Sequence, residues 1–515
     1  MNATVRLDRH RLETALKGVP QAWQLFIDGD YRPSLGGETI ERVGPGHGVV
    51  VSRYQKAMPV DLDLALAAAR KAFDEGPWPD LPGAERARIL GKAADLIEAK
   101  SELLATLDTL ESGKPISQAR GEMAGAVDIW RYAAALARDL HGESYSTLGS
   151  NKLGVVVREA IGVVSIITPW NFPFLIVSQK LPFALAAGCT AVVKPSEMTS
   201  ASTLALGTIL AEAGVPAGVV NILSGFGPDI GAPMTTDPRV DMVSFTGSTR
   251  VGKAAMAAAA PTLKKLSMEL GGKNPQLIFA DADLDAALDA AVFGAFFNAG
   301  ECCNAGSRLI VQQDIAAEFL AEFVKRAKTV VTGDPLDAAT KVGALISVPH
   351  LELVEGHVRR AGTAGAQIAL GGERLGSDGG QFMAPTVVAD VTPGMAIARD
   401  EVFGPVATVL RFKTAQEAIA IANGVEYGLS ASVWSRDFDT CVGTARRIRA
   451  GTVWTNTFMD GAAELPFGGY RQSGLGRELG RNAVSDYTEE KTLHLHCGPR
   501  TAWWLPRSAD ETKSH

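Results

Sequence analysis

Two adjacent cysteines, Cys302 and Cys303, stand among small residues in the stretch 296–308, which reads FFNAGECCNAGSR. A cysteine that loses its proton is a strong nucleophile, so a thiolate here could attack an electrophilic carbon and form a covalent intermediate. The plainer interpretation is a buried pair, because cysteines often pack as small apolar side chains. The segment therefore predicts either thiol chemistry or core packing.

Two polar residues elsewhere in the chain stand in settings that suit catalysis. Glu269 comes shortly before a pair of glycines in the stretch MELGGKNP, so its carboxylate has room to move and could accept a proton. Asn171 lies in the proline-framed turn TPWNFP, directly after an apolar run. Each also has an ordinary interpretation, as a solvated carboxylate at a strand end and as a cap of the following helix.

The elements that must carry these residues alternate between strands and helices. Short β-branched runs predict strands at 163–167, 191–193, 219–223 and 242–245. Ala-rich segments between and after them predict helices at 181–188, 201–214 and 249–260. Apolar residues at three- and four-residue intervals predict earlier helices at 61–76, 83–110 and 121–140. This pattern is typical of an α/β fold with a parallel sheet covered by helices.

A second α/β unit is predicted from Gly271 to about Gly480, and it contains the cysteine pair after a helix that opens at Asp281. The segment 143–159 alternates in polarity around Gly149-Ser150-Asn151, which indicates a hairpin. A late run at 491–496 alternates in the same way and predicts one more strand.

Composition sets limits on the function. The chain has 515 residues, 46% hydrophobic and 21% charged, which is too long for one core and predicts two or three domains. Its formal net charge of -7 and the absence of like-charge blocks argue against nucleic-acid or membrane partners. The N-terminus lacks the apolar core of a signal peptide, so we expect a cytoplasmic protein. Five widely spaced cysteines and eight unclustered histidines predict neither disulfides nor a metal site.

The motifs together resemble those of the aldehyde dehydrogenases, from about Gln24 to His496. In that family a glycine, a glutamine or glutamate and one variable residue precede the nucleophile, which selects Cys303 over Cys302. The resemblance implies that Cys303 attacks an aldehyde, that the thiohemiacetal loses hydride to become a thioester, and that Glu269 activates the water that releases the carboxylic acid.

The same resemblance assigns supporting roles to three more residues. It implies that the amide of Asn171 and the backbone N–H of Cys303 stabilise the oxyanion. It also places Lys180 and Glu478 on a proton path to Glu269, with a surface ion pair as the alternative.

The cofactor implied is NAD, bound at a variant of the Rossmann site. The sequence has no G-x-G-x-x-G fingerprint, only GFGPDIG at 225–231. A carboxylate at Glu197 would bind ribose hydroxyls and repel a 2′-phosphate, so NAD is favoured while NADP is not excluded. The implied cofactor-binding residues are Ile167, Thr168, Pro169, Trp170, Lys194, Ser196, Glu197, Gly227, Gly231, Phe245, Thr246, Gly247, Ser248, Leu270, Glu401 and Phe403.

The substrate implied is a small-molecule aldehyde whose identity the sequence leaves open. The residues predicted to contact it are Phe172, Leu175, Gln179, Cys302, Asn304, Phe458, Gly461 and Phe467, with Phe174, Val177, Ser178 and Met459 as further lining candidates. Because Gln179 and Gly461 stand where some relatives carry large aromatics, we expect a roomy, polar mouth. The run AAELP at 462–466 resembles betaine aldehyde dehydrogenases, so a cationic amino-aldehyde is a further possibility without being the preferred one.

The implied architecture is the aldehyde dehydrogenase fold in three parts. Residues 1–141 and 160–270 form the predicted Rossmann-like NAD-binding domain, and 271–484 form the catalytic α/β domain. Residues 142–159 and 485–515 form a small β oligomerisation element and a tail, and the assembly implied is a homodimer or homotetramer. Trp503 and Trp504 of the tail are expected to pack against a neighbouring subunit, with a surface anchor within one subunit as the alternative.

Some features depart from the family pattern or leave alternatives open. Arg471 stands where the family usually has lysine, which puts a nearby monovalent-cation site in doubt, and Glu301 replaces the more usual glutamine. The position of Cys302 beside Cys303 leaves open a regulatory disulfide or sulfenamide. A cofactor-independent thiol esterase and a non-catalytic binding or structural protein on the same fold are the two alternative functions.

Overall fold

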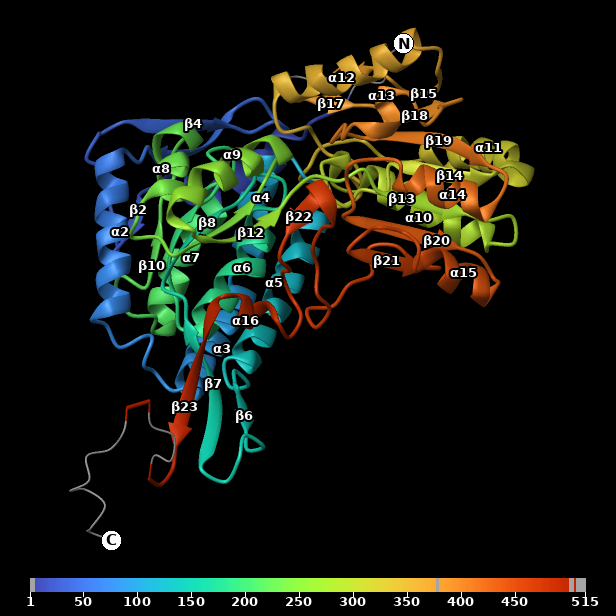
Figure 1. The fold of residues 1–515 in the computed structure, drawn as a ribbon. Helices are drawn as coiled ribbons and strands as arrows, with labels where there is room; N and C mark the ends of the chain where they lie inside the picture. The colour runs from blue at the N-terminus through green and yellow to red at the C-terminus, as the bar shows by residue number, and fades with distance from the viewer. Residues whose placement is uncertain (1–4, 377–378, 500–503, 506–515) are drawn as a thin grey trace, which may run out of the picture.

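The computed structural model describes residues 5–376, 379–499, 504 and 505. Two α/β bodies lie side by side, and a small β-sheet projects from the first of them (Figure 1). Trp504 is exposed and Trp503 lies outside the described residues, so their predicted packing stays a prediction. No helix in the described part of the chain is long and apolar enough to cross a membrane.

The first body is built on an eight-stranded sheet whose five central strands are parallel. In spatial order its strands are β22 (Gly474–Leu475), β12 (Lys265–Glu269), β11 (Met242–Thr246), β8 (Val163–Ile167), β9 (Thr190–Lys194), β10 (Val220–Ile222), β2 (Leu25–Ile27) and β3 (Asp30–Arg32). The four predicted strands are confirmed as β8, β9, β10 and β11. From β8 the chain first builds outward through β9 and β10 and then returns to β11 on the other side, which opens a crevice at the carboxyl ends of β8 and β11.

Helices cover both faces of this sheet because successive side chains on a strand point to opposite faces. Val164 and Ile166 of β8 pack into one apolar core, whereas Val163 packs into another. Helices on the first side are α3 (Gly83–Ala99), α4 (Ser101–Ser112), α5 (Ile116–Leu136), α6 (Pro173–Ala187) and α7 (Ala201–Ala213). Those on the other side are α2 (Pro59–Asp74), α8 (Ala232–Thr236) and α9 (Thr249–Ala259).

Two predicted helix boundaries are wrong. The segment 83–110 forms two helices, because the chain bends at Lys100, whose backbone N–H closes α3 while its carbonyl begins α4. Helix α6 begins at Pro173 instead of Leu181 and continues through Pro182. Proline costs an interior helix one hydrogen bond, and the burial of α6 against α5 and α3 outweighs that cost.

The second body is built on a seven-stranded sheet in which six strands are parallel. In spatial order they are β15 (Gln367–Leu370), β18 (Thr386–Ala389), β19 (Val406–Phe412), β14 (Arg308–Gln312), β13 (Pro275–Ile278), β20 (Ser430–Trp434) and β21 (Thr452–Thr455). Its main helices are α10 (Leu284–Phe296), α11 (Ala316–Ala327), α12 (Val348–Thr363), α13 (Ala396–Arg399), α14 (Ala415–Asn423) and α15 (Phe438–Ala445). The chain passes from one sheet to the other between Glu269 and Pro275.

The predicted hairpin and late strand meet in the projecting sheet. Strand β7 (Lys152–Ala160) pairs with β6 (Glu143–Tyr145) on one side and with β23 (Thr488–His496) on the other, antiparallel in both cases. Most of β23 is exposed. The N-terminal region adds α1 (Arg9–Lys17) and a three-stranded sheet of β1 (Ala22–Trp23), β4 (Thr39–Val43) and β5 (Val50–Gln55), which the sequence reasoning missed.

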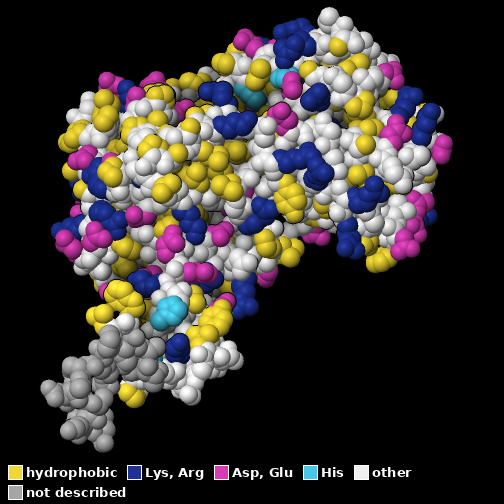
Figure 2. Space-filling view, in the orientation of Figure 1, with side chains coloured by type: hydrophobic (Ala, Val, Ile, Leu, Met, Phe, Trp, Pro, Cys, Tyr) yellow, Lys and Arg dark blue, Asp and Glu magenta, His cyan; other side chains and the backbone are white. Residues whose placement is uncertain are grey.

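Charges of both signs are scattered over the face seen in Figure 2, as the small net charge leads one to expect. Apolar side chains gather on this face over α8 and α9, and Val251 and Met256 of α9 are exposed. One late strand returns to the first body: β22 pairs with the end of β12, so Gly468 before it and Glu478 after it both come close to Glu269.

Candidate active site

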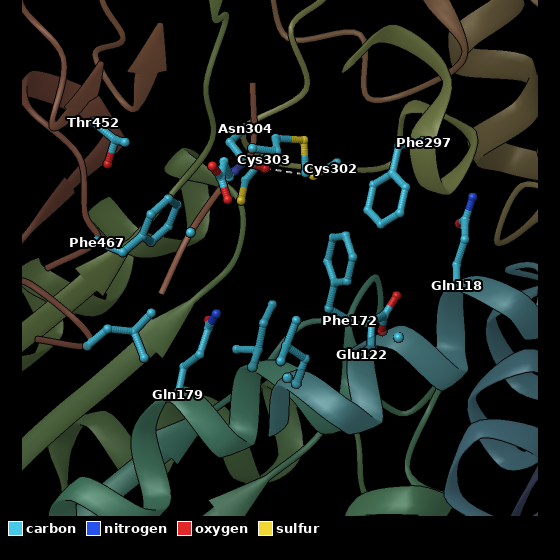
Figure 3. Close-up of a pocket in the computed structure, with 18 of the residues that line it drawn as sticks. Gln118, Glu122, Phe172, Gln179, Phe297, Cys302, Cys303, Asn304, Thr452 and Phe467 are labelled. Atoms are coloured by element: carbon cyan, nitrogen blue, oxygen red, sulfur yellow. Dashed lines mark hydrogen bonds between the residues drawn. The ribbon is translucent and has the colours of Figure 1, made fainter. Parts of the chain in front are cut away.

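A cavity of about 1100 Å³ lies where the two bodies meet. Its walls come from α5, α6 and the ends of β11 and β12 in the first body, and from α10, the cysteine segment and residues 452–479 in the rest of the chain. Cys302, Cys303 and Asn304 lie at one end of the view in Figure 3, with Phe467 on one side of the hollow and Phe172 and Phe297 on the other. Cys303, Glu269 and Glu478 all reach this cavity.

The cysteine segment is held in an unusual backbone conformation. After α10 the chain makes a short turn in which Asn298 and Ala299 adopt left-handed φ values of 51° and 54°. Such a conformation is costly for residues other than glycine and persists only where contacts fix it. The amide of Asn298 donates to the carbonyls of Asn171 (3.1 Å) and Glu301 (2.9 Å). These bonds connect the turn after α10 to the proline-framed turn at 168–173, which holds Asn171.

Cys303 itself is placed by its backbone. Its carbonyl accepts a hydrogen bond of 2.9 Å from the Asn274 side chain. A Cβ added to Gly272 would come within 2.5 Å of the same carbonyl, so only glycine fits there. The neighbouring thiol of Cys302 and burial raise the pKa of Cys303 well above its usual value. Cys303 is therefore a neutral thiol at neutral pH in this arrangement and needs a base.

Glu269 supplies a carboxyl group at the end of β12. It is buried, and its Oε1 has no hydrogen-bond partner among residues 5–376, 379–499, 504 and 505. Burial, followed by the negative charge of Glu478, raises the pKa of Glu269 well above its usual value. A Cβ on Gly468 would come within 2.7 Å of Oε1, so the segment before β22 packs tightly against this carboxyl. A raised pKa and an oxygen without a partner in the described chain suit a group that accepts and releases protons during catalysis.

Lys180 and Glu478 form a buried ion pair close to Glu269. Both side chains are at least nine-tenths buried, so the alternative of a surface ion pair is wrong. Lys180 also donates to the hydroxyl of Ser244 (3.2 Å), which lies 3.3 Å from the hydroxyl of Tyr487. Polar groups thus continue from Glu269 into the first body, although a proton path through them stays a prediction.

Asn171 is buried, and its side-chain amide donates to the carbonyl of Glu301 at 3.1 Å. The amide therefore already holds the cysteine segment two residues before the nucleophile, and it does not cap α6. One amide hydrogen is used in this contact. The second is what an oxyanion beside Cys303 would require, and that role stays a prediction.

Glu401 and a cluster of three rings, those of Phe403, Trp170 and His350, lie on the other side of the cysteine segment. Glu401 accepts a hydrogen bond of 2.9 Å from the backbone N–H of Gly272, and burial raises its pKa to about 7. Phe403 has a left-handed φ of 55° and packs edge-to-face with Trp170 at 5.3 Å. The Nε2–H of His350 donates to the Phe403 carbonyl at 2.7 Å, and the His350 ring also packs against Trp170. Sequence reasoning missed His350, because a lone histidine carries no spacing signal.

The crevice between β8 and β11 has the features of a dinucleotide site. The hydroxyls of Thr168 and Thr246 are buried there and have no partner within the described residues. Ser248 caps α9 by accepting from the Val251 N–H, so its oxygen is engaged while the helix N-terminus faces the crevice. Orphaned hydroxyls at a topological switch point fit a ligand with many polar groups.

Residues farther along the crevice complete this surface. Lys194 is buried, donates to the Pro195 carbonyl at 3.0 Å, and lies 3.7 Å from the carboxylate of Glu197. Gly227 and Gly231 bound a single π-helical turn before α8, and a Cβ on Gly231 would crowd the Lys194 side chain at 3.3 Å. The weak glycine motif therefore lies beside the lysine that was predicted with it.

Comparison with known proteins agrees with this arrangement. The sequence profile of the aldehyde dehydrogenase family matches residues 31–493. An aldehyde dehydrogenase of Aspergillus niger is 42% identical over 475 residues, which cover 92% of this chain and 95% of that protein.

The chain belongs to the aldehyde dehydrogenase family.

Two solved structures show the same fold. That of the NAD-dependent aldehyde dehydrogenase from Sinorhizobium meliloti matches with a TM-score of 0.94 and 50% identity, covering 95% of this chain and 98% of that one. That of betaine aldehyde dehydrogenase from Staphylococcus aureus in complex with NAD+ matches with a TM-score of 0.94 and 37% identity, covering 97% and 100%. The predicted fold class is therefore confirmed.

Most of the residues predicted to contact the substrate line the cavity, and the others lie on the opposite faces of their helices or loops. Seven of them line the cavity: Phe172, Leu175, Gln179, Cys302, Asn304, Gly461 and Phe467. Phe458 does not, because its ring is buried under the cysteine segment, where a Cβ on Gly294 or Gly306 would touch it. Phe174, Val177 and Ser178 point away from the cavity on the other face of α6, while Met459 reaches it.

The cavity wall is more aromatic than the sequence suggested. Phe293, Phe296, Phe297 and Trp454 also line it. They come from α10, the turn after it and β21, and the sequence analysis did not name them among the lining residues. Three carboxylates, of Asp128, Asp289 and Asp460, stand at exposed positions of the wall against one cation, Lys341.

The two departures from the family pattern have local partners. Arg471 donates to the carbonyls of Asn423 (2.9 Å) and Val425 (2.6 Å), so its guanidinium is engaged by the backbone of the second body. The Glu301 carboxyl is buried and accepts from the Ile346 N–H at 3.0 Å, and burial raises its pKa well above the usual value.

Proposed function

We propose that this NAD-dependent aldehyde dehydrogenase uses Cys303 as its nucleophile and Glu269 as its base to convert an aldehyde into a carboxylic acid. The observation that carries the proposal is that both side chains open into one cavity, with Oε1 of Glu269 free of any partner in the described chain. Membership of the family argues against the two alternatives, a cofactor-independent thiol esterase and a non-catalytic protein.

In the first step the Cys303 sulfur bonds to the aldehyde carbon, and its proton passes to Glu269. The carbonyl oxygen becomes an oxyanion, which the second amide hydrogen of Asn171 and the backbone N–H of Cys303 are placed to stabilise. NAD, when bound, supplies the acceptor for the hydride that leaves this carbon. Glu269 then loses the thiol proton to solvent and takes a proton from the water that attacks the thioester. The carbon–sulfur bond breaks, the acid leaves, and Glu269 returns this proton to the Cys303 sulfur.

The residues of the crevice fit NAD. Lys194, Ser196 and Glu197 would hold the adenosine ribose, Glu401 the other ribose, and Phe403 the nicotinamide ring. The helix N-terminus at Thr246, Gly247 and Ser248 would receive the pyrophosphate. Ile167, Thr168, Pro169, Trp170, Gly227, Gly231, Phe245 and Leu270 would form the remaining walls. NADH formation from a panel of aldehydes tests the proposal, and its absence with every aldehyde would overturn it.

Glu197→Gln is expected to raise kcat/KM for NADP about tenfold while changing that for NAD less than about threefold. The substitution removes a charge that would face the 2′-phosphate, and it leaves Lys194 without its ion-pair partner 3.7 Å away. The measurement is the ratio of NADP to NAD efficiency. Glu38→Gln, which removes an exposed carboxylate paired with Lys56, is the matched control. An unchanged ratio in Glu197→Gln would contradict this role.

The dissociation constant for NAD is expected to rise as the pH falls below about 7. Burial raises the pKa of Glu401 to that value, so the carboxyl gains a proton below it and ceases to be a charged acceptor for ribose hydroxyls. Glu401→Gln should bind NAD weakly and without this pH dependence. Titration of NAD binding by protein fluorescence between pH 5.5 and 8.5 measures the affinity and its pH dependence in the wild type and in Glu401→Gln. The same pH dependence in the variant would show that another group causes it.

The domain division and the assembly are also proposals. We infer an NAD-binding domain of residues 1–141 and 160–270 and a catalytic domain of 271–484, with β22 reaching back to the first. Strand β23 is the outer strand of the β6–β7–β23 sheet and has no partner strand on its other side among the described residues. It also exposes Leu493 and Leu495. This edge and this apolar face could pair with a second copy of the chain in a homodimer or homotetramer. The cytoplasmic location stays a prediction.

A further inference from the structure

A buried lysine that no step of the mechanism uses lies behind the cavity wall. Lys114, in the connection between α4 and α5, is 2% exposed. Its Nζ donates to both carboxylate oxygens of Glu122 at 2.6 Å each. It also lies 4.3 Å from the ring centroid of Phe172. Phe172 and Glu122 line the cavity, whereas Lys114 is not part of its wall.

The lysine is the shared cation of several buried acids. Besides Glu122, its charge lowers the pKa of Asp108 and of Glu301, both of which burial raises. Asp108 accepts a hydrogen bond of 3.4 Å from the backbone N–H of Phe174, in the first turn of α6. Lys114 is thus fixed by its two hydrogen bonds to Glu122 of α5 and is buried, so it is a rigid support and not a free side chain.

Lys114 supports an aromatic wall of the cavity, which we define as the rings of Phe172, Phe297 and Phe293. The rings of Phe172 and Phe297 are stacked, with centroids 6.1 Å apart, and Phe297 lies 4.9 Å from Phe293. Figure 3 shows Phe172 between Phe297 and Glu122, with Phe467 across the hollow. All three rings of the wall belong to the cavity lining.

We propose that Lys114 is a positioning residue that fixes the ring of Phe172 by a cation–π contact and thereby makes the aromatic wall a platform for flat aryl aldehydes. The inference rests on the proposed function and adds a substrate class to it. A desolvated cation over a ring restricts the ring to one orientation. Without it, a phenylalanine beside so large a cavity has room to tilt, and a flat substrate loses its stacking surface while a short alkyl aldehyde loses little.

The test compares Lys114→Met, Phe172→Leu and the double variant, with benzaldehyde and propanal as substrates. Lys114→Met is expected to lower kcat/KM for benzaldehyde about tenfold, mainly through KM, and that for propanal less than about threefold. In the Phe172→Leu background the same change should have less than about a twofold effect on benzaldehyde, because the group through which Lys114 acts is gone.

Two results would overturn the proposal. Equal losses for benzaldehyde and propanal would indicate a general structural role, and independent, multiplying losses in the double variant would show that Lys114 does not act through Phe172. Arg120→Met, which breaks an exposed ion pair between Arg120 of α5 and Glu102 of α4, is the matched control and should change neither value of kcat/KM.

Removing one partner of a buried pair can prevent folding, so Lys114→Met/Glu122→Met provides a second variant. Its apolar pair restores packing without a cation, and the same loss with benzaldehyde is expected. Recovery of wild-type selectivity in this variant would overturn the proposal. Failure of the proposed function is distinguished separately, because the wild-type protein would then form no NADH from either aldehyde.

Discussion

Cys303→Ala is expected to lower NADH formation about 10⁴-fold or more with every aldehyde, because it removes the atom that bonds to the substrate carbon. Cys302→Ala should keep kcat within about threefold. The thiol of Cys302 donates to the Asn304 side chain at 2.8 Å and lies in the apolar cluster with Phe172 and Ile176, so its contribution is to the cavity wall. Steady-state NADH formation with both variants measures the difference.

A second readout separates the two cysteines by their ionisation. Contact with the Cys302 thiol is the foremost cause that raises the pKa of Cys303, so removing that thiol should lower this pKa. The midpoint of iodoacetamide alkylation against pH should therefore move to lower pH in Cys302→Ala. Equal inactivation by the two alanine substitutions would contradict the assignment of Cys303 as the sole nucleophile.

Glu269→Gln is expected to lower steady-state turnover about 10³-fold, the usual contribution of a positioned general base. If the glutamate chiefly activates water, one equivalent of NADH should still form in a rapid first turnover, and the thioester on Cys303 should accumulate. Hydroxylamine, a nucleophile that needs no base, should then restore turnover. Stopped-flow absorbance and intact-protein mass measure the burst and the acyl enzyme.

The pH profile gives the sign of the same effect. Burial and the charge of Glu478 raise the pKa of Glu269, so wild-type activity should fall as the pH drops through that raised value and the carboxylate gains its proton. Glu269→Gln should lack this acid limb. A variant without any burst would show that Glu269 is also required to take the proton of the Cys303 thiol, and unchanged steady-state turnover would contradict its role as the base.

The pairing of the two bodies explains why the site needs both. Cys303 lies before β14 of the second sheet, and Glu269 ends β12 of the first. Between them the chain carries Gly271 and Gly272, where an added Cβ would strike the Glu401 carboxylate at 2.1 Å or the Cys303 carbonyl at 2.5 Å. The glycine pair noted in the sequence therefore serves close approach of backbone to these groups, in addition to any freedom it gives Glu269.

The sequence by itself determined the parallel strands and predicted the candidate reacting residues that lie at their ends. Local signals indicated them: the small-residue setting of Cys303, the glycines after Glu269, and the β-branched runs of β8 to β11, which are buried on both faces and so lack a regular alternation of polar and apolar residues. The family resemblance supplied the choice of Cys303 over Cys302 and the nature of the cofactor.

Only the tertiary structure decided how distant segments meet. The return of β22 to β12 buries Glu478 beside Lys180 and turns a suspected surface pair into an internal one. The same packing sends Phe458 beneath the cysteine segment, brings Phe293 and Trp454 to the cavity, and sets Lys114 against Phe172. These outcomes depend on contacts between residues far apart in the chain, whereas periodicity and turn chemistry report only on near neighbours, so no local pattern could have predicted them.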